Sequence, residues 1–273
     1  MTLNCNGKLI DISSPKVMGI LNITPDSFFH VGKYKNESDI ILQVEKMLFE
    51  GATFIDVGAY SSRPGAIHIS EDEELQRIVP IIELLVKHFP EIIISVDTFR
   101  SNVAKKTIKA GAAIINDISG GKMDTKMFTA IAELQVPYII MHMLGTPQNM
   151  QQNPVYEDVT KEVISFFAAQ IFKLHQLKIN DIIIDVGFGF GKTIEHNYQL
   201  LKDLSLFKNL DAPILAGISR KSMLYKPLDT TPQLALNATT SANTIALLNG
   251  ANILRVHDVK EAMEAIKIVE QLS

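Results

Sequence analysis

Eight short runs rich in isoleucine, valine and leucine recur along the whole sequence, and stretches with helical periodicity separate them. The runs are near-continuous in apolar residues instead of alternating with polar ones, which is typical of strands covered on both faces. Strands that alternate with helices predict an α/β fold with a parallel sheet. The eight predicted strands lie at residues 16–21, 53–58, 92–97, 112–117, 137–142, 181–186, 213–218 and 251–256.

The chain is 273 residues long, which is about the length of one barrel of eight βα units. Eight alternations in that length favour a (β/α)₈ TIM barrel, and an open doubly wound sheet is the alternative. No linker or change of composition divides the sequence. We therefore expect a single domain over residues 1–273, with 47% apolar residues to form its core.

Three of the segments between the strands carry clear helix signals. Ser70 and Glu73 form a capping-box pair ahead of a one-sided apolar stripe. Pro80 inside that stripe predicts a kink. A second stripe occupies residues 158–177, and a last helix is expected to begin at Asp258.

Composition and charge exclude several classes of protein. The net charge is −4 and no basic run is present, so a nucleic-acid-binding surface is not expected. No apolar run approaches the ~18 residues that a membrane span needs, and the N-terminal residues lack the apolar core of a signal peptide. Cys5 is the single cysteine, so an internal disulfide is impossible. These features together predict a cytoplasmic protein.

The stretch DVGFGFGKT, residues 185–193, ends like the P-loop of a nucleotide-binding protein. A P-loop has four residues between its two fixed glycines, because successive N–H groups must surround a phosphate. Only three residues separate Gly187 from Gly191. The spacing therefore argues against ATP binding.

Polar residues follow almost every predicted strand, and in a barrel these strand ends meet at the rim that carries the active site. Taken singly, Asp56 and Asp117 could cap helices or fix turns, and His142 could be a hydrogen-bonded core residue. Caps, turns and core positions do not readily explain why so many polar residues converge at one rim, because buried charges must pair with each other or with a ligand. The strand-end residues are Asn22, Asp56, Asp97, Asn116, Asp117, His142, Asp185, Ser219, Arg220, Lys221, Arg255 and His257.

These polar groups sort by charge into two sets. Asp97, Asn116 and Asp185 offer acceptors, which suit a flat heterocycle with several N–H donors. The donors and positive charges suit an anion, which the helix start at Asp258 also favours; they come from Arg63, Arg255 and His257. The sequence thus predicts a ligand in which a donor-rich ring is joined to a phosphate group.

Eight motifs in this order resemble the successive motifs of the dihydropteroate synthase family, and they span residues 19–260. Related corrinoid methyltransferases share the short pterin-binding motifs, but SRPG together with SRKS favours the synthase. The motifs are GILNITPDSF, SSRPGA, SVDTF, INDISGG, MHMLGTP, DVGFGFGK, ISRKS and RVHDV.

The resemblance implies a TIM-barrel transferase of folate biosynthesis. Enzymes of the family condense 6-hydroxymethyl-7,8-dihydropterin pyrophosphate with p-aminobenzoate, giving 7,8-dihydropteroate and pyrophosphate. The family uses Mg²⁺, commonly forms homodimers and is the target of sulfonamides. The implied partners are therefore small-molecule substrates and a second copy of the chain.

The resemblance also implies a function for individual residues. The catalytic set is Asp97, Lys221, Arg255 and His257. The pterin set is Asp97, Asn116, Met141, Asp185, Gly217 and Lys221. The pyrophosphate set is Asn22, Ser62, Arg63, Arg255 and His257, with Asn22 also as the ligand of Mg²⁺. Val256 is a further substrate-binding residue. The aminobenzoate set is Ser62, Arg63, Pro64, Phe190, Lys221 and Ser222.

One loop departs from the family pattern. After Ser27 and Phe28 the family usually continues with one residue, an aspartate and two glycines, whereas this chain has Phe29, His30 and Val31 before Gly32. The change leaves three alternatives open. They are a weaker lid or altered metal handling, loop drift in which Lys33 or Asp26 fills in, and a pterin-binding module that no longer turns over. A class I aldolase is disfavoured, because Lys221 lies in a polar turn and not in an apolar pocket.

Overall fold

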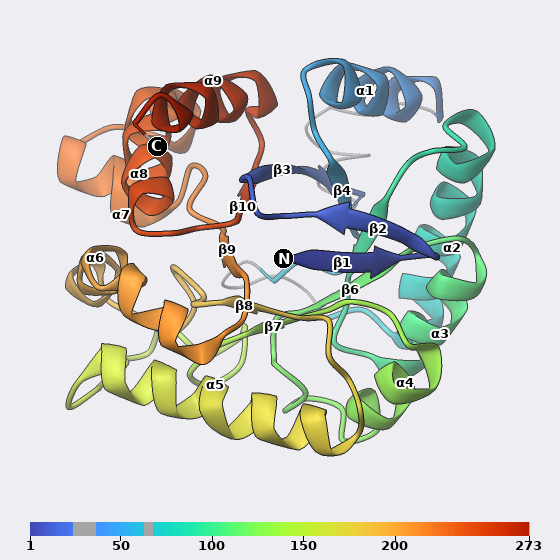
Figure 1. Cartoon of the computed structure of the whole chain (residues 1–273), viewed down its shortest axis with the longest axis horizontal. Helices are drawn as coiled ribbons and strands as arrows, with labels where there is room; N and C mark the ends of the chain where they lie inside the picture. Colours follow the sequence, from blue (N-terminus) through green and yellow to red (C-terminus); the bar gives the residue numbers. More distant parts are fainter. Residues whose placement is uncertain (24–36, 63–67, 273) are drawn as a thin grey trace.

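The computed structural model describes residues 1–23, 37–62 and 68–272. Eight parallel strands form a closed barrel in the order β10-β3-β4-β5-β6-β7-β8-β9, and helices surround it (Figure 1). The predicted TIM barrel is confirmed. Its strands are β3 (Lys16–Asn22), β4 (Phe54–Gly58), β5 (Ile94–Asp97), β6 (Ile114–Asp117), β7 (Tyr138–Met141), β8 (Ile182–Asp185), β9 (Ile214–Ala216) and β10 (Ile253–Val256).

The helices of the outer layer follow the predicted alternation. They are α1 (Glu37–Phe49), α2 (Glu71–His88), α3 (Ser101–Lys109), α4 (Met127–Leu134), α5 (Val159–Gln176), α6 (Ile194–Lys202), α7 (Ser222–Tyr225), α8 (Leu236–Leu248) and α9 (Val259–Glu270). In the described part of the chain, the 3₁₀ segment η2 (Leu204–Leu210) follows α6, and η3 (Lys226–Leu228) and η4 (Pro232–Leu234) lie between α7 and α8.

Helix α2 shows how far the sequence signals hold. Ser70 Oγ accepts a hydrogen bond from the Glu73 backbone N–H at 3.1 Å, but the Glu73 carboxylate bonds Arg77 and does not complete the box. Pro80 lies inside the helix, which continues past it to His88. The predicted kink at Pro80 therefore does not interrupt the helix.

The barrel interior has an apolar part at the N-terminal ends of the strands, the lower end, and a polar part at their C-terminal ends, the upper end. The outward faces of the strands pack against the helices in the main core. The inward side chains at the N-terminal ends of the strands form a second cluster, made of Met18, Phe54, Ile114, Ile139, Ile183, Leu215 and Ile253. Because this layer is buried and apolar, polar groups inside the barrel are confined to the opposite mouth.

An antiparallel hairpin of β1 (Thr2–Cys5) and β2 (Lys8–Asp11) covers the lower end of the barrel, and our sequence analysis did not predict it. Leu3 and Cys5 point into the lower cluster. The signal was present, since Asn6-Gly7 is a strong hairpin turn, and both residues adopt the left-handed φ values, 52° and 82°, that this turn requires.

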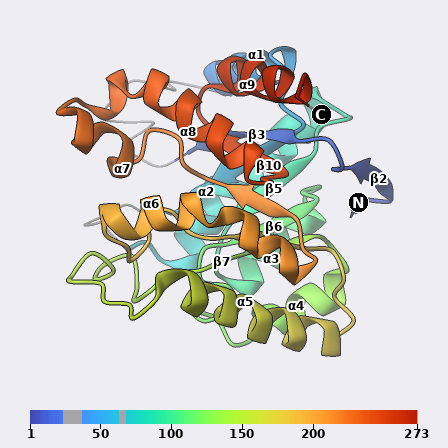
Figure 2. The ribbon, with the colours of Figure 1, turned by 60° about the vertical axis from the view of Figure 1, so that its left-hand side comes forward.

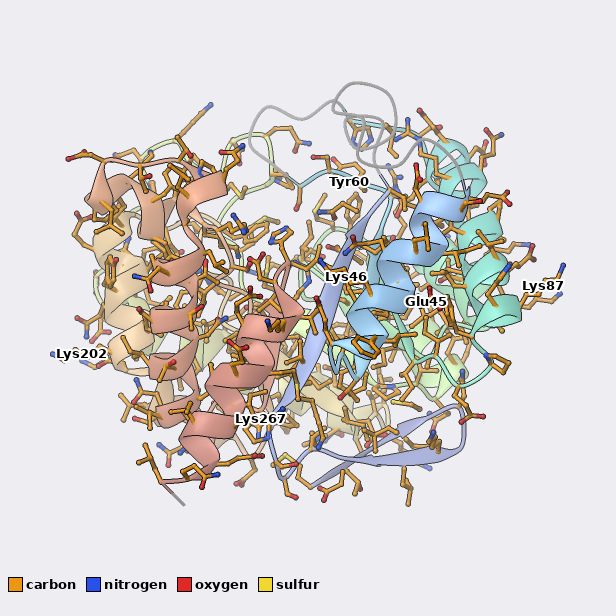
Figure 3. All side chains as sticks on the ribbon, turned by 90° about the horizontal axis from the view of Figure 1, so that it is seen from above. Glu45, Lys46, Tyr60, Lys87, Lys202 and Lys267 are labelled. Atoms are coloured by element: carbon orange, nitrogen blue, oxygen red, sulfur yellow. The ribbon has the colours of Figure 1, made fainter. Side chains whose placement is uncertain are left out.

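The hairpin and the loops after the strands lie at opposite ends of the molecule. In Figure 2 the hairpin is at one end of the barrel and α7, which follows β9, is at the other. Figure 3 shows the same separation, with the hairpin at the bottom and Tyr60, just beyond β4, at the top. Among the described residues, no helix has the length and apolar character needed to cross a bilayer.

Candidate active site

Arg255 on β10 lies at the centre of the polar mouth, between carboxylates from two other strands. Its Nε donates to Asp56 Oδ2 at 2.6 Å, and its Nη2 donates to Asp97 Oδ2 at 3.0 Å. Asn116 Nδ2 also lies 3.2 Å from Asp56 Oδ2. One guanidinium and one amide therefore link four strands of the barrel through their side chains.

The two carboxylates differ in their access to solvent. The Asp56 side chain is fully buried, whereas the side chains of Asp97 and Arg255 are 15% and 18% exposed. Burial raises the pKa of Asp97 to about 7, against the opposing effect of Arg255. Asp56 and Asp97 raise the pKa of the Arg255 guanidinium, which stays charged. Asp56 is thus an internal counter-charge, and Asp97 can also meet a ligand.

A second group of residues faces the same mouth from β8 and β9. Asp185 ends β8, and its Oδ1 accepts from the Gly187 backbone N–H at 2.8 Å. A Cβ added at Gly217 would lie 3.5 Å from Asp185 Oδ2 and 3.9 Å from Lys221 Nζ. The missing side chain at Gly217 therefore leaves open space between a carboxylate and an ammonium.

Burial has opposite effects on the two charged groups of this pair. It raises the pKa of Asp185, and Lys221 and Arg255 oppose that rise. It lowers the pKa of Lys221 to about 8, and Asp185 opposes that fall. Each group favours the charged form of the other, so the pair can present one acceptor and one donor to a ligand in the mouth.

The loop after β8 brings an aromatic ring to the lysine. Lys221 Nζ donates to the Phe188 carbonyl oxygen and lies 4.8 Å from the centroid of the Phe190 ring. Phe190 is partly buried against an apolar cluster that contains Met141, the last residue of β7. Ser222, directly after Lys221, is the first residue of α7.

The residues predicted to face an anion are only partly described. His257 Nδ1 lies 3.0 Å from Ser219 Oγ, and Ser219 Oγ also accepts from the His257 backbone N–H. Asn22 Oδ1 and the Asp97 carboxylate both approach Gly58, where an added Cβ would lie 3.5 Å and 3.7 Å from them. Ser62 is half-buried at the end of a described segment, whereas Arg63 and Pro64 lie outside the described residues.

Two features predicted for the anion-facing side of the mouth differ from the structure. The side chain of Val256 is fully buried in the core between strands and helices, so only its backbone can face the mouth. The Asp258 carboxylate lies at the start of α9 without capping it and instead binds Arg220 through two hydrogen bonds of 2.8 Å. The Asp258 side chain is therefore paired with Arg220 and does not cap α9.

Two strand-end residues have structural positions, as their ordinary explanations predicted. Asp117 is fully buried and accepts from Ser119 N, Ser119 Oγ, Gly121 N and Tyr138 Oη, so it fixes the turn after β6. His142 is buried against Phe166 and bonds Lys192, and burial lowers its pKa to about 2. His142 is accordingly neutral.

Sequence analysis left two site residues unassigned. Asp56 had been interpreted as a possible cap; its spacing of two from Gly58 along β4 could have shown that both point into the barrel. The ammonium of Lys192 is buried within the loop after β8. For Lys192 we find no signal in the sequence.

Comparison with known proteins gives a consistent identification. The family model described as "Pterin binding enzyme" matches residues 18–257. The chain is 44% identical to dihydropteroate synthase of Escherichia coli K12 over 272 residues, which cover 99% of this chain and 96% of the relative. It is 42% identical to dihydropteroate synthase of Haemophilus influenzae over 270 residues, 98% of each chain.

Solved structures agree with these relatives in fold. Yersinia pestis dihydropteroate synthase with a sulfonamide drug complex superposes with a TM-score of 0.94 at 43% identity, covering 100% of this chain and 99% of that one. The Xanthomonas albilineans synthase in complex with 7,8-dihydropteroate gives 0.89 at 33% identity, covering 100% and 98%. The chain therefore belongs to the dihydropteroate synthase family of pterin-binding enzymes, the family that its motifs resemble.

Proposed function

We propose that this dihydropteroate synthase joins 6-hydroxymethyl-7,8-dihydropterin pyrophosphate to p-aminobenzoate at the barrel mouth, with the residues that the family motifs imply. The observation that carries the proposal is the arrangement of Asp97, Asn116, Asp185, Lys221 and Arg255 around one opening. Ion pairs and hydrogen bonds through Asp56 link Asp97, Asn116 and Arg255, and Asp185 and Lys221 interact electrostatically with Arg255 and with each other. Neither a corrinoid methyltransferase nor a silent binding module needs this combination of pterin acceptors and fixed positive charge.

The pterin ring lies deepest in the mouth in this proposal. Asp97 and Asp185 accept hydrogen bonds from its N–H groups, Asn116 adds a further polar contact and Lys221 donates to a ring acceptor. The open space at Gly217 supports this placement, because a flat ring can approach Asp185 there without meeting a side chain. Met141 covers the apolar surface of the ring from the end of β7.

The pyrophosphate faces the charged side of the mouth. Arg255 and His257 bind it, together with Ser62 and Arg63 and with backbone groups around Val256. The raised pKa of Arg255 supports this assignment, because the guanidinium stays charged while it exchanges a carboxylate for a phosphate oxygen.

The p-aminobenzoate binds above the pterin, between the loop after β4 and the loop after β8. Ser62, Arg63, Pro64 and Ser222 line its site, and Phe190 stacks near it. The Lys221 ammonium over the Phe190 ring supports a position where an aromatic carboxylate finds both a ring and a positive charge.

Mg²⁺ is part of the proposal, and the mouth offers oxygen donors for an ion with few protein ligands. The described residues contain no cluster of three or more His, Cys, Asp or Glu side chains that could form a cage. Asn22 offers a single amide oxygen close to Gly58 and Asp97. Mg²⁺ often takes one or two protein ligands and completes its shell with water and substrate phosphates. Bound there, the ion would supply charge neutralisation of the pyrophosphate.

The protein residues act mainly by position and fixed charge. The C9–O bond to pyrophosphate breaks, and the amine nitrogen of p-aminobenzoate forms the C9–N bond and then loses a proton to solvent. Arg63, Arg255 and His257 stabilise the leaving group, while Asp97 and Asp185 stabilise the electron-deficient pterin. The aromatic amine is unprotonated at neutral pH, so preorganised charge can carry the reaction without a strong base.

A homodimer in the cytoplasm completes the proposal. Large apolar side chains are exposed on neighbouring segments, Leu228 and Leu234 in η3 and η4 and Ile245 and Leu248 in α8. A second copy covering them would bury this surface. Sedimentation should show a dimer for the wild type and a monomer for Ile245→Lys. A wild-type monomer at assay concentrations would remove the dimer from the proposal.

Pyrophosphate release, measured with and without p-aminobenzoate, tests the reaction. We expect release that depends on the amine and that falls strongly in Arg255→Met, which removes the central charge. Tight pterin binding without release would identify a binding module. Methyl transfer from a methylated folate would identify the corrinoid enzyme.

A further inference from the structure

The turn between β8 and α6 leaves its backbone carbonyls without partners in a helix or strand. Gly187, Gly189 and Gly191 all have left-handed φ values, 71°, 81° and 63°. Unpaired backbone groups are costly inside a protein. One carbonyl of the turn has a backbone partner, since the Gly187 oxygen accepts from the Phe190 N–H at 3.0 Å, and side chains supply the other partners. The partners of these carbonyls therefore determine the shape of the turn.

Lys192 supplies the largest share of these partners. Its side chain is nearly fully buried. Its Nζ lies 3.0 Å from the Gly187 oxygen and 3.1 Å from the Phe190 oxygen. It also lies 3.1 Å from the oxygen and 3.0 Å from the Nδ1 of His142, just beyond β7. An ammonium has three hydrogens, so these four acceptors use its full donor capacity.

The positions of these acceptors tie three parts of the rim together at one atom. Gly187 begins the turn, Phe190 ends it and His142 follows the neighbouring strand. Without the ammonium, the Gly187 oxygen would keep only its bond from the Phe190 N–H, and the oxygens of Phe190 and His142 would each lose the bond from Lys192. Neither water nor a neutral side chain would place a positive charge beside all three oxygens.

The turn also carries groups of the proposed aminobenzoate site. Lys221 Nζ donates to the Phe188 oxygen, in the middle of the turn, and lies over the Phe190 ring. Asp185 is held differently, because it belongs to β8 and pairs with Met141 and Leu215 in the barrel ladder. Movement of the turn therefore displaces Phe190 and Lys221 more than Asp185.

We propose that Lys192 is a positioning residue for the second substrate: its ammonium fixes the β8–α6 turn against the end of β7 and so sets Phe190 and Lys221 where p-aminobenzoate binds. The inference rests on the proposed function, since it assumes the substrate sites assigned above. It concerns a residue outside those sites, whose side chain touches only the protein groups named here.

The outer part of the turn has supports of its own. Gln151 Nε2 donates to the Gly189 oxygen at 2.6 Å and Tyr156 Oη donates to the Gly191 oxygen at 2.7 Å. The Gly189 backbone N–H donates to Asn197 Oδ1 at 2.7 Å. Loss of Lys192 should therefore shift the inner side of the turn while the outer side stays attached.

Steady-state kinetics of the 273-residue enzyme with Mg²⁺ test the inference. They compare Lys192→Met with Lys192→Arg and with Lys122→Met. Lys192→Met keeps much of the side-chain volume and removes the charge. Lys192→Arg keeps the charge, but its planar fork cannot reproduce the same set of bonds. Lys122 is the control, an exposed lysine whose ammonium lies 4.5 Å from the centroid of the Phe166 ring.

We expect the KM for p-aminobenzoate to rise about tenfold or more in Lys192→Met, while the Kd for 6-hydroxymethyl-7,8-dihydropterin pyrophosphate, measured without the amine, stays within about threefold. Lys192→Arg should give a smaller rise of the same KM, and Lys122→Met should leave it unchanged. A purely structural lysine would lower Tm without separating the two substrates in this way.

Three results would overturn the inference. They are an unchanged KM for p-aminobenzoate in a folded Lys192→Met enzyme, an equal weakening of both substrates, and the same KM effect in Lys122→Met. If Lys192→Met does not fold, an unchanged KM in Lys192→Arg overturns it and a raised one supports it. Failure of the proposed function is distinct, because the wild type itself would then lack amine-dependent release.

Discussion

Three aspartates at neighbouring strand ends have different environments although their sequence contexts are similar. Asp56 is a buried partner of Arg255, Asp97 shares that arginine but reaches solvent, and Asp117 holds a turn through four donors. The sequence placed all three at the rim, but could not separate them, because some of the donors come from residues distant in the chain. For Asp117, the Tyr138 hydroxyl is such a donor.

Replacing two of these acids by asparagine should separate activity from stability. We expect Asp97→Asn to lower kcat/KM at least about tenfold with little change in Tm, because a charged acceptor for the pterin is lost. Asp117→Asn should lower the free energy of unfolding by about 2–4 kcal/mol, because its amide N–H groups would face donors. Kinetics and thermal melts of both variants check this. Unchanged kinetics in Asp97→Asn would remove that residue from the mechanism.

The pH dependence of kcat/KM should show two limbs. Asp97 has its pKa raised to about 7, so its carboxylate form is lost as the pH falls through that value. Lys221 has its pKa lowered to about 8, so its ammonium form is lost as the pH rises through that value. We expect a bell-shaped profile with a maximum between these values. Lys221→Arg should remove the alkaline limb, and a flat profile across neutral pH would contradict both assignments.

At the scale of elements, the strands were predicted well and the loops were not. Every predicted run overlaps one observed strand of the barrel. Continuous Ile and Val content reflects burial on both faces, and it can be recognised without knowing the neighbouring strand. Loop geometry depends on contacts with other loops. The β8–α6 turn shows this, since its carbonyls bind Lys192 within the turn, Gln151 and Tyr156 in the segment before α5, and Lys221 before α7.

Two glycines of this turn should respond differently to alanine. A Cβ at Gly187 would lie 2.0 Å from the His142 oxygen, a clash with backbone that side-chain movement cannot relieve. At Gly189 the nearest atom is Lys221 Cδ at 3.4 Å, so mainly the φ of 81° opposes substitution. We expect Gly187→Ala to cost about 3 kcal/mol or more and Gly189→Ala about 1–2 kcal/mol. Denaturant unfolding of both variants measures this, and equal costs would contradict it.

At the scale of the whole molecule, the barrel separates stability from chemistry along its axis. The hairpin β1–β2 and the lower cluster fill one end, and the charged mouth occupies the other. Burying an unpaired charge is costly. The polar strand ends therefore gather at one mouth, where each can pair with another side chain, a ligand or water. Substitutions at the hairpin should therefore act on stability alone.

Two leucines of the hairpin provide a matched test. Leu3 is 1% exposed and Leu9 is 69% exposed. We expect Leu3→Ala to lower the free energy of unfolding by about 3 kcal/mol and Leu9→Ala to change it by less than about 0.5 kcal/mol. In both variants kcat/KM should equal that of the wild type at a temperature where the protein is folded. A large activity loss in Leu3→Ala without unfolding would show that the two ends communicate.

The sequence by itself determined the barrel, the order of its strands along the chain and the set of polar residues at its mouth, because burial patterns and motifs are local properties of the chain. Only the tertiary structure decided which acid pairs with Arg255, that Asp258 binds Arg220 and that Lys192 is buried in the β8–α6 turn. These are contacts between residues up to 199 positions apart. Their energies depend on distance and burial, which exist only once the strands have closed into a barrel.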